Sequence, residues 1–263
     1  MTIFPEHFNK IHLAVCDSTS DHLKQNLVRL EADLPLMVSA DVQLSGHGRE
    51  NRSWSSSENL GIYATFGFLL PDKQGLSLLS LTAGIAVGSM LESWTGKSFV
   101  LKWPNDILAD GKKIAGILCE TIVNADKILC LVGIGINVNQ RAGDFPEDLR
   151  ERAGSLKLLT GMEWPVPGGR ERLAASMTSW LKKLFEDRRS CIIDRARQLS
   201  RSFLGRIISF QHQGLMERGI FLDIAPDGGL LLGLPGAEKK VFYSGEWLDG
   251  SGAATRPGET LRP

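Results

Sequence analysis

Apolar residues in the first seventy positions fall in short runs separated by polar residues and glycines. Residues 11–15, 36–44 and 60–70 alternate well enough to predict three β-strands. Cap and turn formers follow the first strand, and residues 21–30 then have the spacing of a short helix. The glycine-containing residues 45–51 are therefore expected to form a loop between the second and third strands.

The middle of the chain predicts a buried helix and then further strands. Residues 77–94 carry apolar side chains at helical spacing with small residues between them, which predicts a closely packed helix of about 18 residues. Residues 98–123 predict two strands joined at the dipeptide Asp110-Gly111, which favours tight hairpins. Residues 127–139 predict one more buried strand. Strands interleaved with helices indicate an α+β fold with a mixed sheet.

The pattern changes towards the C-terminus. Residues 141–169 predict loop, helix and loop, and residues 170–200 predict one long helix. The apolar face of that helix comprises Leu173, Met177, Trp180, Leu181, Leu184 and Phe185. From residue 205, four or five short strands separated by glycine turns predict a small β-barrel. We therefore expect a first domain at 1–200, a barrel at 201–250, and a disordered polar tail at 251–263.

Charge and cysteine usage narrow the function classes. Thirty basic residues balance thirty acidic ones, so no global field favours nucleic acid or an anionic membrane. The four cysteines are dispersed without metal-ligand or redox spacing, as in a reduced cytosolic protein. No signal peptide is recognisable, and the longest apolar stretches, 76–90 and 128–138, fall short of a span of about 20 residues. We expect a cytoplasmic protein without a membrane segment.

Residues 45–51, Ser-Gly-His-Gly-Arg-Glu-Asn, form a flexible and charged loop. Gly46 and Gly48 free the backbone amides, and Arg49 and Arg52 add two guanidinium groups. This combination binds phosphate or carboxylate oxygens. It is not a Walker loop, because no Gly-Lys-Ser/Thr follows. A solvated turn is the competing interpretation.

Residues 102–106, Lys-Trp-Pro-Asn-Asp, place a cation, an aromatic ring and an Asn-Asp pair at the end of a predicted strand. Pro104 fixes its own φ and keeps Trp103 extended, so Asn105 and Asp106 are presented where the strand ends. A turn with a buried tryptophan is the competing interpretation.

Lys113 lies seven residues after Asp106, on the strand that returns from the predicted hairpin. If the hairpin closes, Lys102, Asp106 and Lys113 converge. Two lysines and one carboxylate near an anion-binding loop suit a reaction on a phosphorylated carboxyl group.

Residues 133–139, Gly-Ile-Gly-Ile-Asn-Val-Asn, lack the third glycine and the helix start of a dinucleotide fingerprint. They predict a buried strand whose glycines allow close approach of a ligand or a neighbouring backbone. Asn137 is either a polar contact or a plain turn residue. Residues 17–19, Asp-Ser-Thr, are an ordinary helix cap when taken alone. The five histidines show no metal spacing.

In this order, the motifs resemble those of the biotin protein ligases. The resemblance rests on residues 17–19, 46–54 (Gly-His-Gly-Arg-Glu-Asn-Arg-Ser-Trp), 59–66, 102–108, 112–120, 133–139 and the C-terminal region that ends in Ser-Gly-Glu-Trp at 244–247. The spacing between Lys-Trp-Pro-Asn-Asp and Lys-x-Ala-Gly-Ile-Leu is highly specific. The resemblance implies a catalytic domain similar to class II aminoacyl-tRNA synthetases and a C-terminal SH3-like barrel.

The activity implied by the resemblance has two steps. Biotin and ATP with Mg²⁺ give biotinyl-5'-AMP and pyrophosphate, and the adenylate then acylates one lysine of a biotin carboxyl carrier protein domain. No DNA-binding domain is expected before the first strand. The resemblance leaves open whether the chain is a monomer or a homodimer.

The resemblance also implies site residues. Lys113, Asp106 and Lys102 would be catalytic, and Asp106 would also steer the incoming lysine amine. The residues that would bind biotin are Ser18, Thr19, Gln43, Gly46, Lys113 and Gly116. Those that would bind ATP or the adenylate are His47, Gly48, Arg49, Arg52, Trp54, Asn105 and Asn137. Residues 46–54, here called the glycine strip, would order over the adenylate when ligand arrives.

The glycine strip departs from the usual family pattern Gly-Arg-Gly-Arg-x-Gly-Arg-x-Trp. His47 replaces the first arginine, Glu50 stands at a commonly basic position, and Asn51 replaces the third glycine. Losing charge-assisted hydrogen bonds of roughly 1.5–3 kcal/mol each predicts weaker binding of the intermediate than in typical relatives. A ligand dissociation constant that is unchanged by His47→Arg would count against this hypothesis.

Three alternatives stay open from the sequence. A lipoate or octanoate transferase of related fold would carry a different acyl cargo. A catalytically impaired paralogue would keep only the binding of a carrier domain. A nucleic-acid-binding barrel has the least support, since the C-terminal region holds few basic residues.

Overall fold

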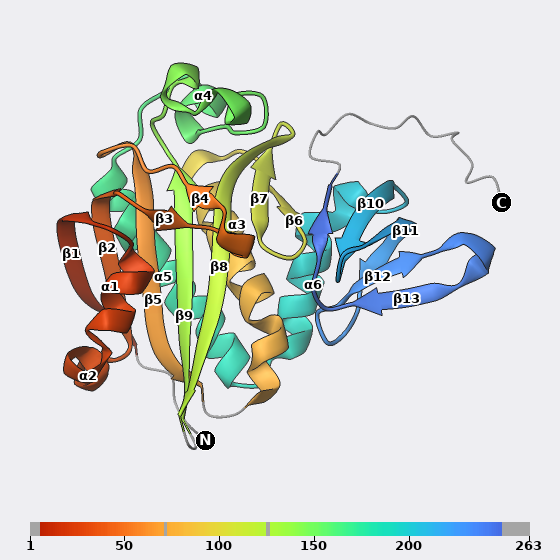
Figure 1. Cartoon of the computed structure of the whole chain (residues 1–263), viewed down its shortest axis with the longest axis horizontal. Coiled ribbons are helices and arrows are strands. Elements are labelled where there is room, and N and C mark those ends of the chain that lie inside the picture. Colours follow the sequence, from red (N-terminus) through yellow and green to blue (C-terminus); the bar gives the residue numbers. More distant parts are fainter. Residues whose placement is uncertain (1–5, 71–72, 125–126, 249–263) are drawn as a thin grey trace.

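The computed structural model describes residues 6–70, 73–124 and 127–248, so the predicted disordered tail lies outside the described residues. A seven-stranded sheet of order β1-β2-β5-β9-β8-β7-β6 forms its centre (Figure 1). The strands are β1 (Asn9–Cys16), β2 (Leu36–Gln43), β5 (Gly61–Leu70), β6 (Val100–Lys102), β7 (Asp106–Ala109), β8 (Lys112–Asn124) and β9 (Lys127–Asn137). Only β1 and β2 pair in parallel, so the sheet is mixed and the predicted α+β class is confirmed.

Helices cover both faces of this sheet. The longer ones are α3 (Leu79–Thr95), α5 (Val166–Phe185) and α6 (Arg189–Ser200), and the shorter ones are α1 (Thr19–Gln25), α2 (Leu27–Leu30) and α4 (Leu156–Thr160). Single turns of 3-10 helix occur at 31–33, 49–51, 142–144, 147–149, 201–203 and 235–237, with a longer one at 73–78. The glycine strip contains the two-residue strands β3 (Gly46–His47) and β4 (Ser53–Trp54), which pair antiparallel.

The central strand β9 shows how one sequence pattern serves both faces. Its even-numbered residues from 128 to 136 are buried in the large apolar cluster with α3 and α5. Leu129 and Leu131 face the other way and pack with Leu23 of α1 in a smaller cluster. Gly133 and Gly135 continue that second face, because side chains alternate along a strand. On this face of β9, the bulky side chains therefore end at Leu131, and the two glycines leave open space above the sheet.

Residues 98–109 do not form the single strand that the sequence predicts. Strand β6 ends at Lys102 and β7 begins at Asp106, and these two residues are ladder partners. Pro104 lies in the turn between them, and it has no backbone N–H to continue a ladder. The region therefore contributes three strands in place of two, while the predicted turn at Asp110-Gly111 is present between β7 and β8.

The predicted long helix is also divided. Helix α5 ends at Phe185 and α6 begins at Arg189, and Asp187 between them adopts a left-handed φ of 57°. Helix α5 also starts earlier than predicted, at Val166, so residues predicted as loop form its first turn. The predicted apolar face is right, with four residues buried and two packed against the core: Leu173, Met177, Leu181 and Leu184, and Trp180 and Phe185.

The C-terminal region forms a five-stranded antiparallel sheet, as the short strands predict. Its order is β13-β12-β11-β10-β14, with β10 (Ile207–His212), β11 (Leu215–Ile224), β12 (Leu230–Gly233), β13 (Lys239–Phe242) and β14 (Glu246–Trp247). Trp103 is 3% exposed, and its Nε1 donates to the carbonyl oxygen of Gly228 at 2.9 Å. Buried residues of both sheets belong to one apolar cluster, and the division into domains at 1–200 and 201–250 stays a prediction.

Among the described residues, one helical segment is long and apolar enough to cross a membrane. Gly75–Thr95 has a mean hydropathy of 1.4, and 72% of its most apolar window is buried inside the protein. The segment includes α3, whose side chains form part of the large apolar cluster.

Candidate functional site

A pocket of about 640 Å³ lies above the glycine floor of β8 and β9. The start of α1, the glycine strip, β6 to β8, the 145–153 segment and β14 surround it. In Figure 1 the strip crosses the sheet between α1 and the C-terminal sheet. Every site residue predicted from the sequence lines this pocket except Gly46, where an added Cβ would lie 2.8 Å from the Trp54 carbonyl oxygen. Their individual roles stay predictions.

One end of the pocket is a buried network of hydroxyl and amide groups. Ser18 is the N-cap of α1, and its Oγ accepts from the backbone N–H of Asp21 at 3.3 Å, so the expected helix cap is present. The backbone N–H and Oγ1 of Thr19 both donate to Gln43 Oε1, at 2.9 and 3.0 Å. Thr65, which the sequence did not single out, lies 2.8 Å from the hydroxyl of Thr19. This network fixes the orientation of the Gln43 amide and suits a small polar ring.

A second part of the lining carries the charged groups. Lys113 Nζ lies 2.7 Å from Asp106 Oδ1, as an ion pair between adjacent strands. Lys102 is the ladder partner of Asp106, and its Nζ donates to the carbonyl oxygen of Trp247 at 3.3 Å. The predicted hairpin between β7 and β8 brings Lys113 to Asp106, and the separate turn between β6 and β7 adds Lys102 to the same wall of the pocket. Such a wall favours an anion in the pocket.

Two glycines and a tryptophan form the floor. A Cβ added at Gly135 would lie 2.3 Å from Trp54 Cε2, and one added at Gly116 would lie 2.9 Å from Trp54 Cζ3. Lys113 Nζ lies 5.6 Å from the centre of the Trp54 ring. The Trp54 Nε1 is buried without a hydrogen-bond partner among the described residues. Only glycine leaves room for this ring, which explains why two paired strands both carry glycine there.

Polar contacts hold the glycine strip over the pocket. Arg49 donates to Asn105 Oδ1 at 3.1 Å and to the carbonyl oxygen of Gly245 at 3.0 Å. Arg52 Nη1 lies 2.5 Å from Glu246 Oε1, and His47 Nε2 lies 2.6 Å from Asp21 Oδ2. Both arginines and the histidine are therefore engaged by the protein itself.

The end of β9 closes the charged side of the pocket. Asn137 is 5% exposed, and its Nδ2 donates to the backbone oxygen of Lys113 at 3.4 Å. Gln140 links Asn137 to the hydroxyl of Tyr63, and burial raises the pKa of that Tyr63 hydroxyl. Tyr63 therefore stays a neutral hydrogen-bonding group.

Comparison with known proteins identifies this arrangement. Residues 13–137 match the model of the biotin/lipoate A/B protein ligase family. A biotin protein ligase from Aquifex aeolicus, solved in complex with biotin and ATP, is 33% identical with a TM-score of 0.74. That alignment covers 91% of this chain and 97% of the Aquifex chain. The chain belongs to the biotin protein ligase family.

Other members of the family align with this chain over different lengths. The bifunctional ligase/repressor BirA of Bacillus spizizenii is 40% identical over 147 residues, which are 55% of this chain but only 45% of that relative. The chain therefore matches less than half the length of this relative. The biotin--[acetyl-CoA-carboxylase] ligase of Paracoccus denitrificans is 28% identical over 226 residues, 90% of its length.

Sequence reasoning missed two walls of this ligase-family pocket. Phe145, Asp148, Leu149 and Arg152 line it from a segment that the sequence predicts only as loop and helix. Glu246, Trp247 and Leu248 line it from the C-terminal sheet. The first wall is attached through Lys113, whose backbone N–H donates to the carbonyl oxygen of Arg152 at 2.7 Å. No local signal in the sequence marks these residues as neighbours of Lys113.

Proposed function

We propose that the chain is an ATP-dependent biotin protein ligase. A biotin carboxylate oxygen attacks the α-phosphorus of ATP, the bond to the β-phosphate bridging oxygen breaks, and biotinyl-5'-AMP and pyrophosphate result. The ε-amine of a carrier lysine then attacks the acyl carbon, and AMP leaves with the bonding electron pair while the amine loses a proton. The proposal extends to this chain the ligands of the Aquifex complex.

The observation that carries the proposal is the ion pair of Lys113 with Asp106 in the charged wall of the pocket. A carboxylate and a triphosphate repel each other, and a lysine between them offsets that repulsion. Lys102 on the same wall stabilises phosphate charge. Asp106 accepts the proton or steers the amine of the incoming lysine.

The polar network provides the biotin end in this proposal. Ser18, Thr19 and Gln43 present hydroxyl and amide groups to the ring system of biotin, and the backbone of Gly46 lies beside them. Gly116 allows the ligand to approach the sheet closely. Lys113 then meets the carboxylate of biotin.

The glycine strip and its neighbours provide the nucleotide end. We assign the adenylate contacts to His47, Gly48, Arg49, Arg52, Trp54, Asn105 and Asn137. The present contacts of Arg49, Arg52 and His47 support a strip that is already folded over the pocket. The resemblance implies that the strip orders when ligand arrives, and the strength of these contacts sets how much of that ordering is left for the ligand to drive.

Mg²⁺ is proposed as the counterion of ATP. Within the described residues, no group of three His, Cys, Asp or Glu side chains could hold a metal alone. Mg²⁺ keeps several waters and is usually held by one or two carboxylates plus substrate phosphates, so Asp106 is a fitting protein ligand. The ion would neutralise phosphate charge during adenylation.

The wider assignments follow the family. We propose a class II aminoacyl-tRNA-synthetase-like catalytic domain and an SH3-like barrel at the C-terminus. The partner is a biotin carboxyl carrier domain of a carboxylase, the location is the cytoplasm, and the chain acts as a monomer or homodimer without nucleic acid or membrane.

Pyrophosphate release from ATP tests the function, with biotin, lipoate or octanoate supplied in turn. Biotin-dependent release is expected, with a loss of at least about 100-fold in Lys113→Ala, the scale of removing one electrostatic group from a transition state. Lys112→Ala is the matched control, because Lys112 is the adjacent lysine and does not line the pocket.

Two outcomes would contradict the proposal. Release that depends on lipoate or octanoate would assign a different acyl cargo. No release with any acid, from folded protein that still binds a carrier domain, would assign a carrier-binding module.

A further inference from the structure

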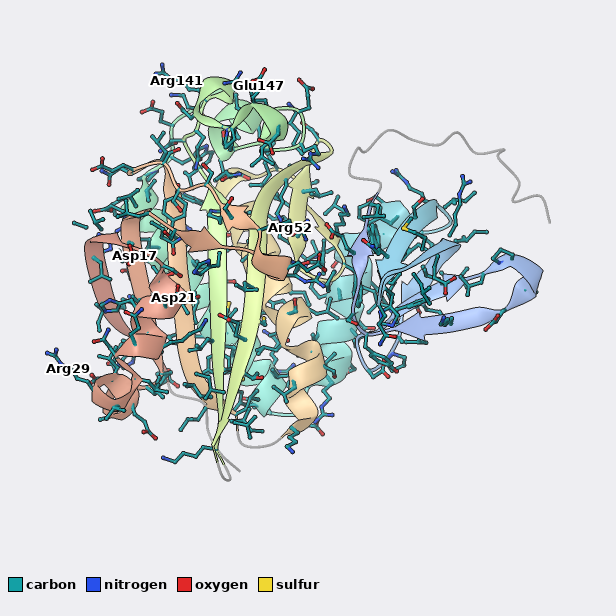
Figure 2. All side chains as sticks on the ribbon, viewed as in Figure 1. Asp17, Asp21, Arg29, Arg52, Arg141 and Glu147 are labelled. Carbon is teal, nitrogen blue, oxygen red and sulfur yellow. The ribbon has the colours of Figure 1, made fainter. Side chains whose placement is uncertain are left out.

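Two acidic residues outside the glycine strip hold it from opposite sides. Asp21 lies on α1 and contacts His47, and Glu246 lies on β14 and contacts Arg52. The two contacts bridge 26 and 194 positions of sequence. Figure 2 labels Asp21 at α1 and Arg52 toward the C-terminal sheet, at the two flanks of the strip. The strip therefore spans from the first helix to the last described strand.

Each acid is more firmly placed than the cation it contacts. The side chains of Asp21 and Glu246 are 28% and 26% exposed, against 46% for His47 and 55% for Arg52. Glu246 is held in the sheet opposite Gln211 of β10. The carboxylates thus belong to the scaffold, and the cations belong to the segment that is held.

A second cation, Lys24, contacts the carboxylate of Asp21. Lys24 Nζ lies 3.4 Å from Asp21 Oδ1 and donates to Glu120 Oε1 at 2.8 Å. Burial disfavours the charge of Lys24, but the hydrogen bond and charge of Glu120 and the charge of Asp21 outweigh it and raise the pKa of Lys24. Lys24 is therefore a stable cation beside Asp21 Oδ1, while His47 contacts the other oxygen, Oδ2. A carboxylate between Lys24 and His47 is a fixed acceptor for the imidazole.

Between these two contacts, the backbone of the strip is strained at Glu50, and the neighbouring Arg49 makes the contacts that hold it. Glu50 adopts a left-handed φ of 56°, a conformation that favours glycine. Arg49 on one side of it contacts Asn105 and the Gly245 carbonyl oxygen, next to Glu246. A strained segment keeps one conformation only where its surroundings hold it.

We propose that Asp21 and Glu246 are positioning residues that fix the glycine strip over the pocket. Asp21 sets the end of the strip nearest the polar network, and Glu246 sets the end nearest the charged wall. His47, at a position where the family pattern has arginine, serves this chain as an attachment to α1. The part of the proposal that concerns substrates rests on the proposed ligase function.

Hydrogen exchange of the backbone amides in residues 46–54, measured on the full chain without ligand, tests the attachment directly. Asp21→Asn and Glu246→Gln are each expected to speed exchange in the strip by about tenfold, because local opening sets the exchange rate. Glu31→Gln and Glu217→Gln are matched controls that remove acids paired with lysines outside the strip. Strip exchange that is unchanged in both test variants, or raised equally in the controls, would overturn the proposal.

Swapping the charges of Arg52 and Glu246 distinguishes the loss of their ion pair from a general loss of structure. Arg52→Glu alone should speed exchange in the strip, and Arg52→Glu combined with Glu246→Arg should restore slow exchange. A double variant that exchanges as fast as the single one would show that Glu246 does not act through Arg52. This readout needs no enzymatic activity, so it stands or fails independently of the ligase function.

Kinetics then connect the attachment to substrates. Asp21→Asn is expected to raise the KM for biotin about tenfold more than the KM for ATP, and Glu246→Gln the reverse, since uniform binding energy appears in KM. If both variants lowered kcat equally and left both KM values unchanged, Asp21 and Glu246 would not act at different ends of the strip, which would contradict the proposal. If hydrogen exchange in the strip changes as expected but no biotin-dependent pyrophosphate release is found, the role of Asp21 and Glu246 in holding the strip stands. The ligase function is then rejected.

Discussion

At the scale of single residues, the pocket floor depends on the absence of side chains. Gly135 and Gly116 are ladder partners on adjacent strands, and both lie against the Trp54 ring. A methyl group at either position would overlap that ring or the Lys113 side chain. Strand residues normally gain stability from a side chain, so glycine here reflects the site and not the sheet.

Gly135→Ala tests this reading. The added Cβ would lie 2.3 Å from Trp54 Cε2, so the indole must move and the strip must shift with it. Because Trp54 is assigned to the nucleotide end, we expect the KM for ATP to rise about tenfold, which corresponds to about 1.4 kcal/mol of lost binding. Gly143→Ala is the control, because nothing lies within 4 Å of its added Cβ. Steady-state kinetics with ATP varied give the answer, and an unchanged KM for Gly135→Ala would show that Trp54 has no part in binding.

The sequence could predict most of this site because its residues lie in short motifs with backbone-determined positions. Asp106 and Lys113 meet across the hairpin that the turn signal at Asp110-Gly111 predicts, and Lys102 meets Asp106 across the separate turn at Pro104. Asp21, Glu246 and Arg152 could not be placed, since each reaches the site through packing between distant segments. An exposed acid or arginine on an ordinary helix, strand or loop carries no signal of its partner.

At the scale of elements, the first turn of α5 shows two adjacent glycines with different surroundings. A Cβ at Gly169 would lie 2.4 Å from Trp94 Cη2 and 2.7 Å from Ile62 Cδ1, whereas one at Gly168 would meet only Pro165 at 3.8 Å. Trp94 itself packs edge-on against Trp164, with ring centres 5.3 Å apart. Gly169 therefore sets how closely α5 approaches α3.

Alanine substitutions at Gly168 and Gly169 should change the free energy of unfolding in opposite directions. Gly168→Ala is expected to raise the free energy of unfolding by about 0.5–1 kcal/mol, because alanine loses less backbone entropy in a helix. Gly169→Ala is expected to lower it by about 1–3 kcal/mol through overpacking. Urea denaturation of the two variants measures both values. Equal effects would mean that α5 tolerates a shift away from Trp94.

Element boundaries were harder to predict than element types, for physical reasons visible here. The alternation along β9 and the apolar face of α5 follow directly from periodicity. The break at Asp187 carries neither glycine nor proline, so only tertiary packing could place it. The early start of α5 was missed because a Pro-Val-Pro-Gly-Gly sequence is typical of loops, although proline is well suited to a helix's first turn.

At the scale of the whole molecule, the two sheets share one apolar core. Phe203 packs edge-on against Trp247 at 4.7 Å between ring centres, and Trp103 lies 6.0 Å from Phe210. Arg197 of α6 donates to Asp223 Oδ1 at 2.9 Å and to the carbonyl oxygen of Ile224. Aromatic and polar contacts therefore both tie the C-terminal sheet to the rest of the chain.

A shared core predicts a single cooperative unfolding transition. Differential scanning calorimetry should give a calorimetric enthalpy equal to the van't Hoff enthalpy, the signature of two-state unfolding. Trp103→Ala is expected to lower the midpoint of that one transition, because it removes a buried ring and leaves the Gly228 carbonyl oxygen without this donor. Two separate peaks in the unmodified chain would show that the C-terminal sheet folds on its own.

The ion pair between Arg52 and Glu246, across 194 positions, has a consequence for how such chains evolve and can be recombined. A chimaera that takes its C-terminal sheet from one relative and its remaining segments from another inherits the two halves of this ion pair from different parents. A substitution at residue 246 should then be accompanied by a substitution at residue 52 across relatives, in spite of their separation. The natural junction for exchanging modules is therefore not the boundary between the two sheets.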